Sequence, residues 1–332
     1  MALLMISGGG LSQYFNKNNC DHNIEFEYKG AWIKIIHTRN CGVSAARNTG
    51  IENATSDYIV FIDPDDTVKE NYFSTIKAFM TSTSVDVAIL GFYQIVEDKD
   101  GNIVKEGEIF PQKNYISNSV EETVRNVLPK YLGYSVNDIL EWVKSTEAIS
   151  KRLEWGAVWR NVYRRDFLNK NQIRFNPSIR LNEDSMFNAM CFSRAQKIRT
   201  LNKGFYCYTI RPSGAFMKKR DAELVGNKMA LLEARSNIVN DLNKRGFNFS
   251  VKDYAGSNVM SCFELIIKMP FSARRETNKY IRNPIVKESI KVLPFTGRKK
   301  VDIPLLALKC NLQALMIYAV NLGKLFGVQF QL

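Results

Sequence analysis

Residues 58–66 read YIVFIDPDD, an apolar strand pattern that runs directly into three carboxylates, Asp63, Asp65 and Asp66. Like charges this close together repel one another, so a positive partner is needed to stabilise them. Two acids separated by one residue can share a divalent cation, and such a cation can also bridge the phosphates of a nucleotide. Taken alone, the motif fits an acidic surface turn equally well, so the surrounding sequence has to decide.

The segments around this turn alternate between strand and helix patterns. Strand patterns cover 32–37, 58–62 and 85–96, and helix patterns cover 42–54 and 69–80. This alternation predicts an α/β layer fold. The turn-forming stretch 98–102 predicts that the third strand returns as a hairpin. Ligands bind at the carboxyl ends of strands in open α/β sheets, and the acidic turn follows such an end.

The second half of the chain continues this alternation and then becomes helical. We expect a helix to begin near Glu183, followed by two strands at 197–201 and 205–210. Helix patterns then cover 221–245 and 254–268.

The composition indicates a globular protein with reduced cysteines. The 332 residues suffice for two domains, or for one domain with an appendage, and 45% of them are hydrophobic and 24% charged. The six cysteines form no CxxC pair, which favours structural thiols in the cytoplasm over disulfides or a structural zinc site. The first ten residues lack the basic flank and long apolar core of a signal peptide.

The positive charge is concentrated near the C-terminus. From Lys268 onward, twelve Lys and Arg face three acidic residues, so nine of the thirteen net positive charges lie there. Such a patch attracts either nucleic acid or an anionic membrane surface. We expect no nucleic acid, because the basic residues precede an apolar helix pattern and do not alternate with aromatic ones.

The apolar spacing from Ile303 to Val328 is helical. Its longest unbroken apolar run, Ala314 to Val320, is much shorter than the ~20 residues of a membrane-spanning helix. Because Lys291 and the basic stretch 297–300 precede it, the pattern is typical of a helix that lies on a membrane. The alternative is that this helix packs on the α/β domain, since an amphipathic helix suits either surface.

Three stretches carry a resemblance to a known family. Residues 40–66 closely resemble the segment that leads to the metal-binding acidic motif of the family-2 glycosyltransferases, which have the GT-A fold. Residues 158–188 look like their acceptor-side segment, which ends in a Glu-Asp pair. Residues 205–216 are similar to the strand and Arg-Pro-x-Ser loop that close the catalytic domain. The resemblance covers roughly residues 30–220, with the three motifs in the family's order.

The resemblance implies an inverting glycosyl- or hexosyltransferase of surface polysaccharide biosynthesis. Such an enzyme takes a sugar from a nucleotide-sugar donor and passes it to a glycan or lipid-linked acceptor, with Mn²⁺ or Mg²⁺ as cofactor. Asp65 and Asp66 would bind the metal, and Arg47, Asp63 and Asp65 the donor. Together with the basic tail, it predicts a cytoplasmic protein peripheral to the inner face of the cell membrane, with an anionic membrane surface as a partner.

The resemblance also implies roles for the Glu-Asp pair. Asp184 would be the general base and Glu183 would orient the acceptor or the base; the alternative is an acid pair at a helix N-terminus, stabilised by the helix dipole. The alternative for Arg47 is a solvated helix arginine. Trp155 and Trp159 either stack on a sugar or pack in the core.

The start of the chain departs from the family pattern. Family members open with two strands that form the base pocket, but here residues 3–12 stand in place of the second strand, with Ser7 and Gly8 where two acids belong. The first strand has no counterpart, which indicates a truncated or divergent member. We therefore expect a GT-A-like α/β domain, incomplete at its N-terminus, over 1–216 and a helical basic extension over 217–332. The alternative function is a catalytically inactive remnant that binds a membrane or a partner.

Overall fold

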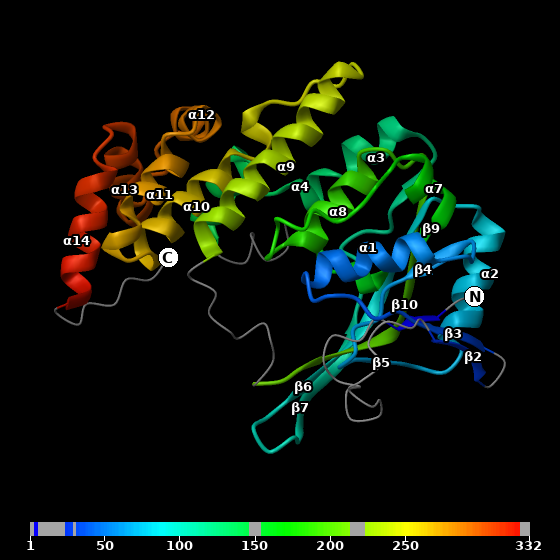
Figure 1. Ribbon diagram of the computed structural model, residues 1–332. Coiled ribbons are helices and arrows are strands. Elements are labelled where there is room, and N and C mark those ends of the chain that lie inside the picture. Colours follow the sequence, from blue (N-terminus) through cyan, green and yellow to red (C-terminus); the bar gives the residue numbers. More distant parts are fainter. Residues whose placement is uncertain (1–2, 6–23, 29–30, 146–153, 213–222, 326–332) are drawn as a thin grey trace. The chain divides into compact units, whose positions relative to one another are not determined.

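The computed structural model describes residues 3–5, 24–28, 31–145, 154–212 and 223–325 (Figure 1). Contacts divide the chain into two compact units. The first combines Met1–Leu128 with Trp155–Lys218, and the second combines Pro129–Glu154 with Lys219–Leu332. The predicted boundary between residues 216 and 217 lies outside the described residues. The second unit also includes Pro129–Glu154, which the sequence analysis assigned to the first domain.

The first unit contains a small sheet made of residues near the start of the chain. Its strands are β1 (Leu3–Met5), β2 (Ile24–Tyr28) and β3 (Ala31–Ile35). They follow the order β1-β3-β2, with β1 parallel and β2 antiparallel to β3. Ser7 and Gly8, which the sequence places at a departure from the family pattern, lie outside the described residues.

The larger sheet of this unit is mixed, which confirms the α/β class. Its described strands are β4 (Tyr58–Val60), β5 (Thr67–Val68), β6 (Val87–Glu97), β7 (Ile103–Ile109), β8 (Ile116–Ser117), β9 (Asn161–Arg164) and β10 (Ile198–Ile210). The order is β4-β9-β6-β10-β5, with β7 beside β6 and β8 beside β10. The β6–β7 pair is the hairpin predicted from residues 98–102.

Strand β10 differs from the prediction of two strands. It runs continuously from Ile198 to Ile210 beside β6, and its register shifts around Gly204. A Cβ on Gly204 would lie 2.9 Å from the backbone of Phe92, so the close approach of the two strands requires glycine here. The shift is a β-bulge, which accommodates the polar interruption without ending the strand.

Helices and apolar side chains cover the large sheet. The helices of this unit are α1 (Val43–Asn53), α2 (Tyr72–Thr83), α3 (Val120–Asn126), α7 (Arg165–Lys170) and α8 (Glu183–Phe192), with a short 3₁₀ helix, η1 (Val158–Arg160). Tyr72, Ile76 and Met80 of α2 pack against Ala88 and Leu90 of β6. Because apolar groups cover both faces of β6, its sequence is a continuous apolar run and does not alternate.

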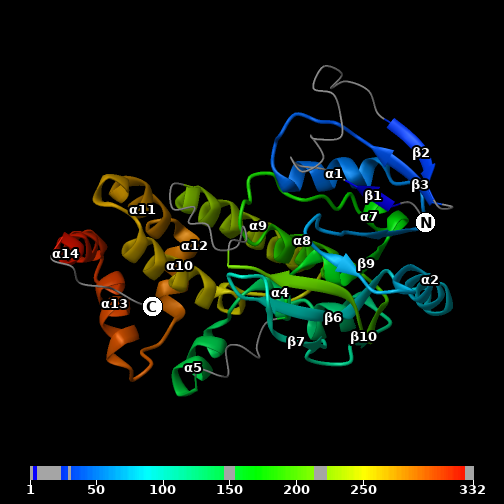
Figure 2. The ribbon, with the colours of Figure 1, turned by 90° about the horizontal axis from the view of Figure 1, so that it is seen from below.

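The second unit is helical, as predicted for the C-terminal region (Figure 2). It consists of α4 (Pro129–Leu132), α5 (Val136–Lys144), α9 (Leu224–Lys244), η4 (Val251–Asp253), α10 (Ala255–Lys268), η5 (Phe271–Ala273), α11 (Arg274–Ile281), α12 (Pro284–Val292), α13 (Lys299–Lys309) and α14 (Gln313–Leu325). Helix α10 is its centre, since it contacts α5, α9, α11, α12 and α14. Its buried residues include Val259, Cys262 and Leu265.

The periodic stretch from residue 303 onward forms two helices and not one. Helix α13 ends at Lys309, and Asn311 follows with a φ of 57° before α14 begins. Asparagine tolerates this left-handed conformation better than most residues, which explains why the break occurs here despite the unbroken apolar spacing. Within the described parts of the chain, no helix is long and apolar enough to cross a membrane.

Candidate active site

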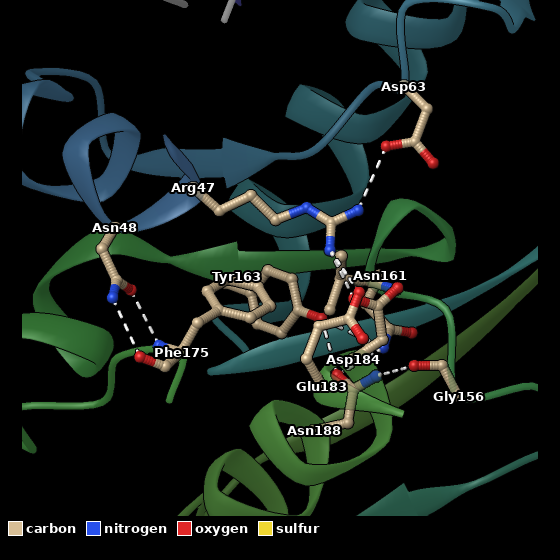
Figure 3. Close-up of polar contacts among 11 residues, drawn as sticks. Arg47, Asn48, Asp63, Gly156, Asn161, Tyr163, Phe175, Glu183, Asp184 and Asn188 are labelled. Atoms are coloured by element: carbon tan, nitrogen blue, oxygen red, sulfur yellow. Dashed lines mark hydrogen bonds and ion pairs between the residues drawn. The ribbon is translucent and has the colours of Figure 1, made fainter. Parts of the chain in front are cut away.

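The positive partner of the acidic turn is Arg47, on α1. One nitrogen of its guanidinium lies 3.1 Å from Asp63, and another lies 2.5 Å from Asp184 and 3.6 Å from Glu183 (Figure 3). The Arg47 side chain is only 9% exposed, so the alternative of a solvated helix arginine is wrong. A single buried cation therefore joins the acidic turn after β4 to the acid pair that begins α8.

Aromatic rings and an amide hold Arg47 in place. Its guanidinium lies 5.4 Å from the centroid of the Phe175 ring and 6.0 Å from that of Phe61. Asn48 donates to the Phe175 carbonyl and accepts from the Phe175 N–H, at 2.9 and 2.8 Å. Burial lowers the pKa of Arg47, but its three carboxylate neighbours outweigh burial and raise it above the usual value. Arg47 is thus a fixed, permanently charged group.

Asp184 is held at both carboxylate oxygens. One oxygen accepts from Arg47 and the other accepts from the N–H of Val158, at 3.2 Å. Burial raises the pKa of Asp184, although Arg47 and the Val158 N–H both act to lower it. A carboxylate with a raised pKa accepts a proton more readily, which suits a general base. Glu183 and Asp184 also occupy the first turn of α8, so the helix dipole stabilises them as well.

Strand β10 fixes the conformation of the acidic turn. The Tyr206 hydroxyl accepts from the N–H of Asp63 at 3.0 Å and donates to a carboxylate oxygen of Asp66 at 2.8 Å. The other Asp66 oxygen accepts from the N–H of Thr209 at 3.0 Å. Burial raises the pKa of Asp66 to about 6. The hydrogen bonds from Thr209 and Tyr206 act to lower it, and the nearby charges of Asp65 and Asp63 add smaller raising effects. Asp66 is therefore tied to β10.

The carboxylates of the turn differ in how free they are to bind a metal. Among the described residues, no group of three or more Asp, Glu, His or Cys side chains is arranged to hold a metal ion. The Asp65 carboxylate is exposed and has no hydrogen-bond partner within that part of the chain. Asp66 would have to share oxygens that already accept hydrogen bonds, which its spare lone pairs permit. The oxygen donors suit Mn²⁺ or Mg²⁺ chemically, but the protein alone does not complete a coordination shell.

The two candidate tryptophans have different surroundings. Trp159 is 4% exposed and stacks on Tyr206 and Tyr208, with ring centroids 4.6 and 5.1 Å away. Core packing, one of the two alternatives, therefore describes Trp159. Trp155 contacts the rings of Phe92 and Tyr208 but is 43% exposed, so part of its ring is accessible to a ligand.

Sequence reasoning missed three residues that shape the site. Tyr206 and Thr209 hold Asp66, and Arg211 donates to the backbone carbonyl of Asp65 at 3.1 Å and to the Glu97 carboxylate at 3.0 Å. The period-2 pattern of residues 205–210 places Tyr206 and Tyr208 on one face, which was an available signal. The pattern gave no indication that this face lies against the acidic turn.

Part of the chain matches a known protein family. Residues 23–138 match the family model described as Glycosyl transferase family 2. Over this part, the chain is similar to a family 2 glycosyltransferase domain. The match confirms the resemblance seen in the sequence, and it includes Arg47 and the acidic turn. Glu183 and Asp184 lie beyond the matched residues, so their roles remain predictions.

Several bacterial glycosyltransferases are similar to this chain. It is 31% identical over 189 residues to "Uncharacterized glycosyltransferase EpsJ" of Bacillus subtilis (strain 168), covering 57% of the chain and 48% of EpsJ. It is 28% identical over 189 residues to glycosyltransferase GlyA of Streptococcus pneumoniae serotype 4, covering 56% of the chain and 24% of GlyA. The chain thus spans half the length of these curated relatives or less.

Solved structures similar to this chain include the 1–349 fragment of S. aureus TarS in complex with UDP-GlcNAc. It shares 15% sequence identity with this chain at a TM-score of 0.47, and the alignment covers 91% of this chain and 77% of the TarS chain.

Proposed function

We propose that this protein transfers a sugar from a nucleotide-sugar donor to a glycan or lipid-linked glycan acceptor in surface polysaccharide biosynthesis. The observation that carries the proposal is the position of Arg47, which holds the acidic turn and Asp184 together at one buried point. Supporting evidence comes from relatives with shorter or weaker matches. They include the "Cholesterol galactosyltransferase" of Borreliella burgdorferi, 24% identical, and the "Minor teichoic acid biosynthesis protein GgaA" of B. subtilis, 37% identical over 73 residues.

The donor would bind at the acidic turn. Asp65 would hold Mn²⁺ or Mg²⁺, with Asp66 as a second ligand, and the cation would neutralise the charge of the leaving nucleoside diphosphate. Asp63 would accept a hydrogen bond from a donor hydroxyl through the oxygen that does not face Arg47. Arg47 itself would add positive charge on the phosphate side of the site.

Asp184 would act as the general base. It would take the proton of the acceptor hydroxyl as that oxygen bonds to the anomeric carbon, while the bond from this carbon to the diphosphate breaks on the opposite side. This in-line displacement inverts the anomeric configuration. Burial raises the pKa of Asp184, and Arg47 opposes this effect, so Arg47 would favour the ionised form that acts as a base. Glu183 would orient the acceptor, and the exposed Trp155 ring would stack on a sugar.

The competing proposal is a catalytically inactive remnant. Ser7 and Gly8 stand where the family pattern has two acids, but Arg47 still contacts both Asp63 and Asp184, as a working site would require. This supports the enzymatic function. We also propose that the protein works in the cytoplasm at the inner face of the membrane, where a lipid-linked acceptor would be available.

A donor screen tests the proposal. The chain would be incubated with a panel of nucleotide sugars and Mn²⁺, and release of nucleoside diphosphate would be followed with and without a glycan acceptor. We expect release from one donor, lost in Asp184→Asn and retained in Asp57→Asn, which changes an exposed carboxylate before β4. Equal release by the wild type and Asp184→Asn would contradict the proposed function.

A further inference from the structure

Helix α14 presents an apolar stripe that its own unit does not cover. Ile317 and Val320 are buried against the unit. The outward stripe is formed by four large side chains that are 41–82% exposed: Leu315, Tyr318, Leu322 and Leu325. Their spacing of three, four and three residues places them on one side of the helix. Exposed large apolar residues in such a continuous row indicate an interaction surface.

The stripe continues onto the neighbouring 3₁₀ helix and meets a cation there. Phe271, which is 41% exposed, contacts Tyr318 edge-to-face with ring centroids 6.1 Å apart. The Arg274 guanidinium lies 4.5 Å from the centroid of the Phe271 ring. Tyrosine and arginine beside an apolar surface are typical of a membrane interface, where one end of the side chain is wet and the other is not.

Helix α11, which packs beside α14 and α10, carries the matching charge. Arg275 and Lys279 of this helix and Arg282, which caps its C-terminal end, are exposed and lie four and three positions apart, so they share one face. Thr277, Tyr280 and Ile281 form its buried side. The cationic face therefore points away from the core of the unit, as the α14 stripe does.

A second group of cations lies between α12 and α13. Lys287, Lys291 and Lys309 line a cavity of about 360 Å³ whose apolar wall includes Ile290 and Leu308. Among the described residues, no acidic side chain lines this cavity. The acid of α13, Asp302, is already engaged by the backbone N–H groups of residues 296 and 297, which lower its pKa. Three lysines therefore gather around one cavity with an apolar wall.

We propose that the second unit docks on an anionic membrane surface, with the α14 stripe and Phe271 inserted among the lipids and the α11 cations on the headgroups. The charge decides between the possible occupants. A second copy of this chain would bring a like-charged surface against α11, whereas anionic headgroups are complementary to it. The α14 stripe is also flanked by Ala314, Ala319 and Asn321, and not by the charged pairs that usually specify helix pairing. The inference deepens the proposed function, because it places transfer at the surface that would present a lipid-linked acceptor.

Vesicle sedimentation tests the docking surface with the full chain. We expect binding to vesicles of phosphatidylglycerol and phosphatidylcholine that weakens with salt, and little binding to phosphatidylcholine alone. Arg275→Gln with Lys279→Gln should weaken binding about thirty-fold, because each basic residue near an anionic surface contributes about 1 kcal/mol. The matched control, Lys244→Gln with Lys252→Gln, removes two exposed cations elsewhere in the unit and should bind as the wild type does.

The apolar stripe is tested separately. Leu315→Gln with Leu322→Gln changes only exposed side chains and should reduce vesicle binding while leaving the circular dichroism spectrum unchanged. If the α11 variant and the Lys244→Gln, Lys252→Gln control lose vesicle binding equally, the attraction does not depend on a defined surface, and the proposal fails. A dimer in analytical ultracentrifugation that the leucine variant dissociates, with no vesicle binding by the wild type, would assign the stripe to a second copy and overturn the proposal. Donor hydrolysis by the same samples in detergent-free buffer tests the proposed function separately. Loss of vesicle binding and loss of hydrolysis can therefore be told apart.

Discussion

The guanidinium of Arg47 lies 2.5 Å from the carboxylate of Asp184, although 137 positions separate the two residues. The same guanidinium also binds Asp63, at the start of the acidic turn. In the proposed mechanism this arrangement connects the donor side of the site to the general base. It also counteracts the effect of burial on the pKa of Asp184, because an opposite charge is in direct contact with that carboxylate.

Replacing Arg47 with glutamine should change the pH dependence of transfer. Burial raises the pKa of Asp184 and Arg47 opposes this, so its removal should raise that pKa further. If Asp184 acts as an ionised base, the acidic limb of the kcat/KM profile should move to higher pH. At neutral pH, kcat/KM should fall roughly 10- to 100-fold.

The matched control is Arg174→Gln, since Arg174 contacts no proposed site residue within the described part of the chain: it pairs with Glu52 at 3.8 Å and donates to Asn169 and to the Ile173 carbonyl. Its pH profile should equal that of the wild type. An unshifted acidic limb in an active Arg47→Gln protein would contradict the role given to Arg47.

The stability of the metal-free protein should report the ionisation of Asp66. Its pKa is about 6 in the folded state, against 3.8 for an ordinary aspartate. Between these values the folded state binds more protons than the unfolded state, so this group's contribution to the free energy of unfolding falls as the pH rises. Asp66→Asn cannot ionise. Relative to the wild type, it should gain about 1–3 kcal/mol of stability between pH 4 and pH 7.

Urea unfolding in EDTA, followed by tryptophan fluorescence, measures this difference. The control Asp57→Asn should show a constant difference from the wild type over the same pH range. A difference for Asp66→Asn that does not change with pH would mean that Asp66 titrates normally.

Asp65→Asn should weaken nucleotide binding without affecting folding. The Asp65 carboxylate is exposed, so its replacement removes no packing. Loss of a proposed metal ligand should lower the Mn²⁺-dependent affinity for the nucleoside diphosphate about ten-fold or more. Isothermal titration calorimetry with and without Mn²⁺ measures this effect. The assignment of Asp65 fails if the variant keeps the wild-type affinity in Mn²⁺.

Tyr206→Phe should loosen the acidic turn while preserving the aromatic stack. The hydroxyl serves both Asp63 and Asp66, so its removal should cost about 1–3 kcal/mol and reduce donor affinity. Tyr208→Phe is the control, because Tyr208 also stacks on Trp159 and its hydroxyl makes no hydrogen bond to any described residue. Thermal unfolding and donor titration of both variants check the prediction. Equal effects of the two changes would assign the role to packing alone.

The local patterns of the sequence predicted most of the first unit. The apolar run before Asp63, the helix after Gly42 and the start of α8 at Glu183 all follow from residues close together in the chain. The boundaries of β10 did not, because the bulge at Gly204 depends on the approach of Phe92 from another strand. The burial of Arg47 could not be predicted from the sequence either, because the rings and carboxylates around it come from distant segments.

Part of the C-terminal structure could also not be predicted from the sequence. The apolar spacing around residues 303–328 predicted helical structure correctly, but periodicity does not register a single left-handed residue such as Asn311. From the sequence, Trp155 and Trp159 were equally good candidates for stacking on a sugar or for packing in the core. Only the stacking of Trp159 between Tyr206 and Tyr208 separates them.

Asp184→Asn tests the central claim most directly. Asparagine nearly preserves the volume of the side chain and its contact with the Val158 N–H, but it cannot accept the acceptor's proton. Donor affinity should stay within about three-fold of the wild type, while the single-turnover rate of sugar transfer should fall by ~10²-fold or more. A single-turnover rate equal to that of the wild type would show that Asp184 is not the base.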